Sequence, residues 1–467
     1  MILGSIRINP EFRRNIWIQF NWSKLIAAPL LTVIAAYVFL LLTDRDYQKL
    51  QSYAELAGGS VILGIWGTRR AADAVAEEVG GGTWESQRMS SLGAWEMTWG
   101  KLLGGTSFVW YCAAIAMTVI LWANVRAGGA GVVGPETLRV VFNFVIGGLM
   151  AQAAAFAIGL LLLRKATRHR RLTITLAQTC GFLLFFFVVA GGFPHARPTA
   201  LDASEPVFKS GIIEWYGTFQ DAAQFRSATI AIACIWAVIA AYRLMRTELQ
   251  YRCLPWIWTV FLLFVIAWAA GLTFGIAWAF LALVVLTYVS FFADNRDPMR
   301  YRWAIRALRR GNWLETVATI PWWSISYVLA AIMVLIISQS IPFIVGASVD
   351  PGAAPAVRMV GMGLQHLGTS LALVMLFMLR DLFVLLWLSS SPWRAKADVL
   401  GIIYLALVYW PPAAIFWAAG AGGLLPVVAP IATGDAAVDF VPIAIELAFA
   451  AFLFYARWRE ITRLKRA

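Results

Sequence analysis

The sequence predicts an all-α polytopic membrane protein of about twelve transmembrane helices. Hydrophobic residues make up 61% of its 467 residues and charged residues 13%, a composition that excludes an ordinary soluble domain. Apolar runs recur along the chain, and they are long enough to cross a bilayer as helices. Because no water can solvate the backbone in hydrocarbon, each run is expected to satisfy its own hydrogen bonds in a helix.

The expected spans share a length near that of the hydrocarbon core and are separated by polar or glycine-rich segments. They are Leu25–Leu42, Lys49–Thr68, Leu102–Ala123, Val140–Leu163, Leu172–Phe193, Ala228–Tyr242, Leu254–Ala270, Leu272–Ala293, Ile320–Val345, Gly363–Leu388, Val399–Ala419 and Phe440–Tyr455. The second is the weakest, because only Leu56–Gly67 is plainly apolar and glycines interrupt it. Its assignment depends on the alternation of charge between successive loops.

Basic residues concentrate in every second loop. Most of the 38 lie on one side of the expected spans, namely Arg13, Arg14, Lys24, Arg69, Arg70, Arg88, Lys101, Arg164–Arg171, Arg243–Arg252, Arg296–Arg310, Arg394, Lys396 and Arg457–Arg466. The positive-inside bias therefore places both termini in the cytoplasm. It also accounts for the net charge of +13, together with attraction to anionic membrane lipids. No aromatic and basic module indicates a nucleic-acid partner.

The stretch Asn9–Lys24 mixes apolar and basic residues before the first span. It predicts a helix lying in the cytoplasmic interface, with an ordinary basic flank as the alternative. No cleavable signal is expected here, so the first span should remain as an anchor. The four cysteines and three histidines are isolated in sequence, namely Cys112, Cys180, Cys234, Cys253, His169, His195 and His366. Their spacing favours neither a disulfide framework nor a metal site.

The cytoplasmic segment Arg69–Lys101 is too long to be a tight turn. We expect a helix over Arg70–Val79, a break at Gly80–Gly82, and a short helix over Trp84–Ser91. Thr83 precedes that second helix and is the candidate for its amino-terminal cap.

Type-2 ABC exporter permeases carry a cytoplasmic signature that this chain resembles in the run EEVGGGTWESQRMSSLGAWEMTWGKLLGG (Glu77–Gly105). In that family an acidic residue and a Gly-Thr precede a short coupling helix, and Gly-Lys-Leu opens the next span. The matching positions are Glu77 or Glu78, Gly82-Thr83, the helix Trp84–Ser91, and Gly100-Lys101-Leu102. The resemblance extends over residues 1–250, with an amphipathic helix before six spans. Residues 251–467 form an additional unit of about six spans, in which the signature is not repeated.

The resemblance implies that a separate ATPase docks on this segment and drives the spans. The expected coupling residues are Glu77, Glu78, Gly82, Thr83, Trp84, Glu85, Arg88, Met89, Gly100 and Lys101. Trp84 and Met89 are expected to be the apolar anchors of the contact, with Glu85 and Arg88 at its polar rim. The chain has no Gly-x4-Gly-Lys-Ser/Thr phosphate loop, so ATP should be bound by the partner and the chain itself needs no cofactor.

Four polar residues within the expected spans are candidates for a transport pathway, namely Asn143, Gln152, Gln178 and Glu446. Interhelical hydrogen bonding is the alternative for the three amides, and snorkelling or a buried pair for Glu446. Arg380 and Asp381 are adjacent, so we expect them not to face each other and to mark the cytoplasmic end of the tenth span, with Phe383–Trp387 along the interface. In the resembled family the outer loop at Gly192–Arg226 forms short re-entrant helices; a plain surface loop is the alternative.

The sequence hypothesis is therefore a permease subunit, not an enzyme, of an ATP-driven exporter. It would work as a homo- or heterodimer in a bacterial inner membrane, with its substrate open among drugs, lipids, glycans and peptides. An ion-coupled secondary transporter has the same layout of spans. A membrane-embedded transferase is the third class, although acidic and histidine residues are scattered here.

The alternating charge yields a prediction about topology. A reporter enzyme fused after Arg310 or at the carboxyl terminus should report the cytoplasm, and one fused within Ala353–Arg358 should report the outside. Paired phosphatase and β-galactosidase fusions measure this. A cytoplasmic signal from the Ala353–Arg358 fusion would rule out the twelve-span arrangement.

Overall fold

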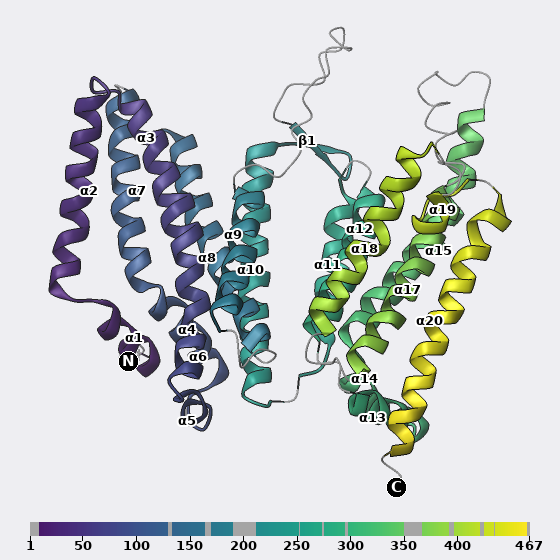
Figure 1. Cartoon of the computed structure of the whole chain (residues 1–467). Helices are drawn as coiled ribbons and strands as arrows, with labels where there is room; N and C mark the ends of the chain where they lie inside the picture. Colours follow the sequence, from purple (N-terminus) through teal and green to yellow (C-terminus); the bar gives the residue numbers. More distant parts are fainter. Residues whose placement is uncertain are drawn as a thin grey trace. The chain divides into compact units, whose positions relative to one another are not determined.

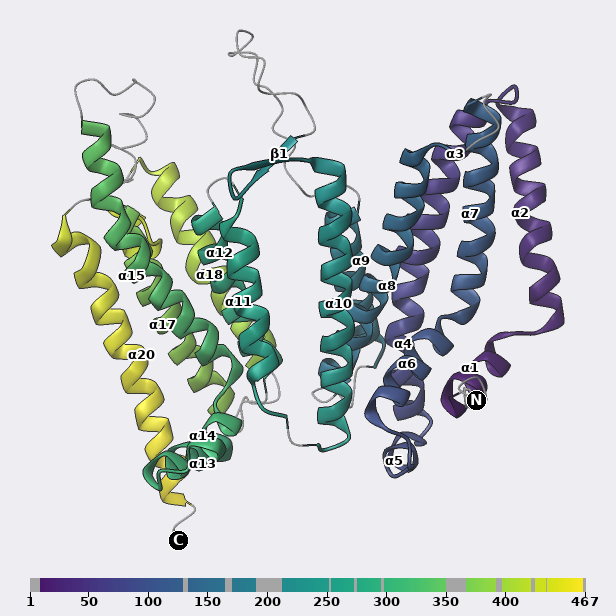
Figure 2. The ribbon, with the colours of Figure 1, turned by 180° about the vertical axis from the view of Figure 1, so that it is seen from behind.

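The computed structural model describes residues 9–128, 133–163, 170–189, 212–251, 253–272, 275–294, 298–349, 367–391, 397–420, 425–433 and 435–464. The chain divides into two compact units, Met1–Cys253 and Leu254–Ala467, here called unit 1 and unit 2 (Figure 1). Each unit is a set of helices, and Figure 2 shows the same ribbon from behind.

Nine helices in the described part of the chain are long and apolar enough to cross a membrane. They are α2 (Trp22–Leu42), α7 (Ser107–Gly128), α8 (Pro135–Leu163), α10 (Ala222–Glu248), α12 (Gly275–Ala293), α15 (Trp322–Val349), α17 (Leu367–Ser390), α18 (Ala397–Ala418) and α20 (Ala436–Leu464). Two others contain shorter apolar stretches, α9 (Arg170–Val189) and α11 (Trp256–Ala270). The protein is therefore a multi-pass, all-α membrane protein.

The weakest expected span lies in a continuous helical run that changes type. It consists of α3 (Tyr47–Glu55), the π-helix η1 (Leu56–Gly67) and α4 (Thr68–Gly80). The glycines of η1 are in close contact with neighbouring helices: a Cβ at Gly59 would collide with the Phe144 ring of α8, and one at Gly67 with Gln152. The interruptions that weaken the apolar signal are thus positions at which this wide helix packs closely against α7, α8 and α9.

At one end of unit 1, α1 (Pro10–Gln19) packs on α6 (Ala94–Gly105), and α5 (Trp84–Arg88) lies beside them (Figure 1). Asn9 caps α1 by accepting a hydrogen bond from the backbone N–H of Glu11 at 2.9 Å. Gly100 and Gly104, four residues apart on α6, form the surface against which α1 packs. A Cβ at Gly100 would lie 2.8 Å from Asn9 Nδ2, and one at Gly104 would lie 2.8 Å from Asn15 Cβ.

The other end of unit 1 carries a β-hairpin (Figure 1). Strands β1 (Ile212–Trp215) and β2 (Thr218–Asp221) pair antiparallel through a turn at Tyr216 and Gly217, whose φ angles are 49° and 72°. Two consecutive positive φ values are those of the turn that suits the twist of a hairpin. The expectation of re-entrant helices is therefore wrong for residues 212–221; residues 190–211 lie outside the described residues.

Unit 2 contains α11 to α20, including α13 (Pro298–Arg309), α14 (Trp313–Thr319) and α19 (Leu425–Val428). Its apolar core draws on α11, α12, α15 and α17, with Leu262, Leu283, Ala330 and Leu385 fully buried. The basic stretch around residues 298–309 forms α13, which ends with Arg306 and Arg309 in its last turn. Asp294, which follows α12, links α13 to the start of α15. Its carboxylate accepts hydrogen bonds from Arg300 of α13 at 2.6 Å and from the backbone N–H of Trp322 of α15 at 3.1 Å.

Candidate functional site

The candidate coupling site is centred on the ammonium group of Lys101, in the apolar second half of α6. Its side chain is only 1% exposed. Nζ lies 2.8 Å from Glu11 Oε1 of α1 and 2.7 Å from Gln87 Oε1 of α5. Glu78 Oε1 of α4 is 3.7 Å away, and the Trp84 ring centroid is 5.7 Å away. One buried cation therefore contacts side chains of three other helices.

Local sequence places each partner of Lys101. Pro10 starts α1, so Glu11 falls in the first turn of that helix. Asn9 donates through Nδ2 to the carbonyl of Glu96, which fixes the start of α1 against α6. Glu96 in turn accepts from the backbone N–H of Gly93 at 3.0 Å and so caps α6. These contacts hold Glu11 opposite Lys101.

Glu78, the last acidic residue of α4, binds one group beyond the glycine turn and one on α1. Its carboxylate accepts hydrogen bonds from Thr83 and from Arg14 of α1. Burial alone would raise the pKa of Glu78, but the hydrogen bonds from Thr83, Gln87 and Arg14 and the charge of Lys101 outweigh this effect. Together they lower the pKa from 4.5 to about 2. Glu78 is therefore a carboxylate at any physiological pH.

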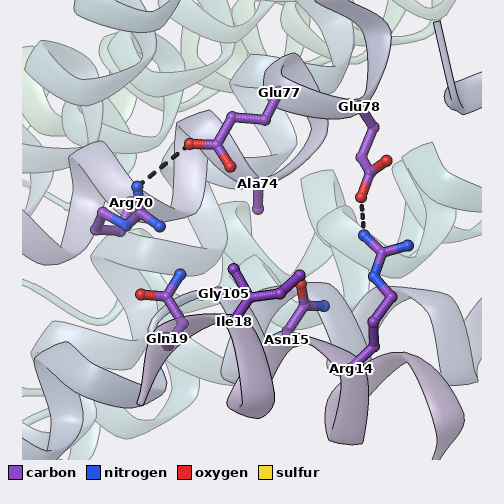
Figure 3. Close-up of a pocket in the computed structure, with 9 residues that line it drawn as sticks. All are labelled: Arg14, Asn15, Ile18, Gln19, Arg70, Ala74, Glu77, Glu78 and Gly105. Carbon is purple, nitrogen blue, oxygen red and sulfur yellow. Dashed lines mark hydrogen bonds and ion pairs between the residues drawn. The ribbon is translucent and has the colours of Figure 1, made fainter. Parts of the chain in front are cut away.

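A cavity of about 170 Å³ lies between α1, α4 and α6, beside this cluster (Figure 3). Figure 3 shows two ion pairs at its edge, Arg14 with Glu78 and Arg70 with Glu77. Asn15 and Gln19 line it from α1. Most of the lining residues are polar or charged, so the cavity suits water better than an apolar ligand.

The structure gathers part of the expected coupling residues and separates the others. Glu78, Thr83, Trp84, Gly100 and Lys101 lie together at the junction of α1, α4, α5 and α6. Glu77 pairs instead with Arg70 at 3.3 Å, and Gly82 forms the turn with φ +70°. Glu85 and Arg88 pair with each other on α5 at 3.0 Å, where the Glu85 side chain is 74% exposed.

Three details of the expected coupling helix need correction. Trp84 is 8% exposed and lies under Lys101, so the prediction that it anchors a partner protein is wrong. The helix spans Trp84–Arg88 rather than Trp84–Ser91. Thr83 precedes it, yet its hydroxyl donates to Glu78 instead of capping the helix. Met89, by contrast, is 84% exposed.

Sequence reasoning missed Glu11 and Gln87, the two closest partners of Lys101. A signal was available for Glu11, because an acid just after Asn-Pro on an otherwise basic helix departs from the pattern of that helix. Gln87 carries no such signal.

Two of the three pathway amides in unit 1 lie at η1. Gln152 of α8 is fully buried, accepts from Trp110 Nε1 at 3.0 Å, and touches Gly67. Gln178 of α9 donates to the carbonyl of Ile65 at 3.2 Å. Asn143 lies nine residues before Gln152 on α8, buried to 6% exposure, and away from this pair. The structure thus gathers two amides around the π-helix and leaves the third apart.

The fourth pathway candidate, Glu446, belongs to a charged cluster in unit 2. It pairs with Arg380, which also donates to Asp381 at 3.0 Å from Nε and 2.8 Å from Nη2. Three tyrosine hydroxyls donate to Asp381, those of Tyr288 at 2.8 Å, Tyr404 at 3.0 Å and Tyr409 at 2.6 Å.

The sequence expectation for Arg380 and Asp381 is therefore wrong. Their side chains bond directly although they are neighbours, since Arg is long enough to fold back on the next residue. Both lie well inside α17, which continues to Ser390 with Leu382 and Leu385 buried, so Phe383–Trp387 belong to the spanning helix. Spacing along the sequence could not bring in the tyrosines, which come from α12 and α18.

Within the described residues, no group of three His, Cys, Asp or Glu side chains has the geometry to hold a metal ion. Cys112, Cys180, Cys234 and Cys253 are free thiols. His169, His195 and His366 lie outside the described residues.

Comparisons of the chain with protein-family models, with curated proteins and with solved structures find no match. The class that the fold defines is thus a multi-pass helical membrane protein, and its function is argued from its own side chains.

Removing the charge of Lys101 should release α1. A Lys101→Met variant removes the closer of the two cations that pair with the buried Glu11 and leaves it only Arg14 at 3.6 Å. Removing one partner of a buried ion pair typically costs up to about 3–5 kcal/mol. Hydrogen exchange of the α1 amides in purified protein should therefore speed up. A second change, Glu11→Gln, should restore part of the protection, whereas Lys49→Met, at a 63% exposed lysine, should have no effect. Unchanged exchange in Lys101→Met would contradict the assignment of this cluster.

Acid should loosen the contact between α4 and α1 through Glu78. Because its pKa is lowered on folding, from 4.5 to about 2, its contribution is fully present above pH 4.5 and disappears as the pH falls through about 2. Exchange of the α4 amides, measured across that range, should accelerate more in the wild type than in Glu78→Gln. The Glu78→Gln variant cannot titrate at this position, so it serves as the control for the wild type. Identical pH profiles for the two proteins would exclude the effect.

Proposed function

We propose that this chain is the transmembrane subunit of an ATP-driven export complex in the inner membrane of a bacterium. In this proposal twelve spans cross the membrane, counting α9, α11 and the run through α3 and η1, and both termini are cytoplasmic. ATP binds to a separate ATPase subunit that docks on α5. The permease works as a dimer, and the chain carries out no chemical reaction.

One observation supports this proposal above all: the buried cluster at Lys101 joins the surface helix α5 to two membrane-crossing segments. Glu78 belongs to α4, which continues directly from η1. Lys101 belongs to α6, which is separated from α7 by Thr106 alone. A displacement of α5 is therefore transmitted through Gln87 and Trp84 to both segments. A motor that works through a permease needs such a rigid connection.

The exposed face of α5 supplies the contact for the ATPase. Met89 follows α5 and is 84% exposed, and Glu85 beside it is 74% exposed. An apolar side chain surrounded by charged ones is the usual composition of a docking contact. The partner contact is accordingly assigned to Met89, Glu85 and Arg88, and Trp84 supports them from inside.

An ion-coupled secondary transporter is the second candidate. The observation that favours it is the cluster of Arg380, Asp381 and Glu446 in unit 2, since ionisable residues inside spans often line ion pathways. This reading needs no ATPase.

A change at Met89 distinguishes the two candidates. Met89→Glu should weaken co-purification with the proposed ATPase subunit by about tenfold, because it puts a charge in the apolar centre of the contact. Met89→Leu keeps the apolar character and should bind like the wild type. Because Met89 is exposed, both variants should be made and inserted normally. ATPase activity in proteoliposomes provides the second readout.

Wild-type binding and ATP-driven transport in Met89→Glu would show that this surface is not the docking site. Transport by the purified chain without any ATPase, driven by an ion gradient, would favour the second candidate instead.

A further inference from the structure

Unit 2 carries two short helices, α13 and α14, at the end at which α20 ends (Figure 1 and Figure 2). They pack against each other, and the side chains of Ala307 on α13 and Thr316 on α14 are buried. The chain turns between them at Gly311, whose φ is +71°. Asn312 then caps α14 by accepting a hydrogen bond from the backbone N–H of Glu315 at 3.3 Å. The two helices therefore form a compact hairpin.

This hairpin lies at the level of the membrane surface, because little free chain separates it from the neighbouring spans. Residues 294–297 connect α12 to α13, and residues 320 and 321 connect α14 to α15. An extended residue covers at most about 3.6 Å, so neither helix can lie far from the end of a span. Asp294 holds them closer, since it binds both Arg300 and the backbone N–H of Trp322. Both views show α13 running across this end of unit 2 rather than away from it (Figure 1 and Figure 2).

Two faces of α13 differ in their chemistry. Three arginines spaced by four and then three residues share one face of the helix, namely Arg302, Arg306 and Arg309. Three apolar side chains with the same spacing share another face, namely Tyr301, Ile305 and Leu308. Each apolar residue directly precedes an arginine, so the two faces lie about 100° apart and adjoin each other. An apolar face that adjoins a basic one is typical of a helix lying in a membrane interface.

The arginine face is open to a partner. Arg306 and Arg309 are exposed, and Arg302 is partly buried. Among the residues that the structure describes, no carboxylate lies within ion-pair distance of these three guanidinium groups, whereas the neighbouring Arg300 pairs with Asp294 at 2.6 Å. Arginine binds phosphate oxygens through two parallel hydrogen bonds and is the usual residue for recognising phosphate groups. The face is therefore suited to phosphate.

The apolar face is exposed as well. Ile305 and Leu308 are exposed on α13, and large apolar side chains continue this surface, namely Trp303, Trp313 and Leu314. Leu314 of α14 is 74% exposed. A group of exposed apolar side chains of this size marks a contact with a membrane or another protein. Tryptophan is also enriched where hydrocarbon meets the headgroups.

We propose that α13 and α14 form a docking surface for anionic phospholipids. The guanidinium groups of Arg302, Arg306 and Arg309 bind the lipid phosphates, and Ile305 and Leu308 insert at the edge of the hydrocarbon. Lipid fits better than a soluble acidic protein, because the surface lies beside the ends of two spans and its basic and apolar faces adjoin as headgroups and acyl chains do. The inference uses unit 2 alone and is independent of the ATPase docking site.

Hydrogen exchange of the full-length protein in lipid nanodiscs tests this proposal. Peptides of α13 should exchange about tenfold more slowly in discs of equal phosphatidylcholine and phosphatidylglycerol than in discs of phosphatidylcholine alone, because each arginine near an anionic surface strengthens the contact severalfold. Phosphatidylserine should protect as phosphatidylglycerol does, since both supply a negative charge. The hairpin of β1 and β2 contains no Lys or Arg, so it is the reference within the same sample.

Variants with matched loss of charge show which arginines are responsible. The triple variant Arg302→Gln, Arg306→Gln, Arg309→Gln should lose the difference between the two kinds of disc. A second triple variant removes three exposed basic residues of unit 1 and should keep that difference; its changes are Arg45→Gln, Lys49→Gln and Arg126→Gln.

Three results would overturn the proposal. The first is equal exchange of α13 in the two kinds of disc for the wild type, a comparison that does not depend on the folding of any variant. The second is equal protection by inorganic phosphate in phosphatidylcholine discs, which would describe a site for a free anion. The third is protection by soluble polyglutamate with none by phosphatidylglycerol, which would assign the surface to an acidic protein.

Discussion

Much of the structure of unit 1 depends on the burial of one ammonium group. Lys101 is 1% exposed, and such a charge is tolerated only where other groups replace its hydration. Glu11 and Gln87 provide hydrogen bonds at 2.8 and 2.7 Å. The need to pair this buried charge fixes the position of α1 across α6, the path of the chain through the glycine turn, and the place of α5. The π-helix η1 and the apolar helix α7 are continued by the helices that meet at this point.

Hydrophobicity alone was enough to predict the class of fold. Each of the twelve apolar segments contains helix in the described part of the chain, because a helix satisfies all of its backbone hydrogen bonds within one segment. The segment at Leu56–Gly67 shows where this signal becomes weak. Its glycines lower the apolar average, yet they are required by close packing against Phe144 and Gln152. Hydropathy does not record packing partners, so it could not predict that this span is a π-helix.

The candidate sites were less predictable, for a reason visible in particular residues. Glu78, Thr83 and Lys101 could be found because they are close in sequence within one loop. Glu11 lies 90 residues from Lys101, and Tyr288 lies 93 residues from Asp381, so those pairs depend on the tertiary structure. Trp84 illustrates the opposite error. A tryptophan in a cytoplasmic loop indicates an apolar contact, but the sequence does not tell whether that contact is with a partner or within the chain.

The π-helical form of η1 makes the length of this segment as important as its composition. In an α-helix each residue advances the chain by about 100° around the helix axis. Loss or gain of one residue within Leu56–Gly67 would therefore turn all of α4 by about that angle relative to α3. Glu78 would then point away from Arg14 and Lys101, although no residue of the cluster had changed. Homologous chains that keep this cluster should therefore keep the number of residues in η1, even where residues other than its closely packed glycines differ.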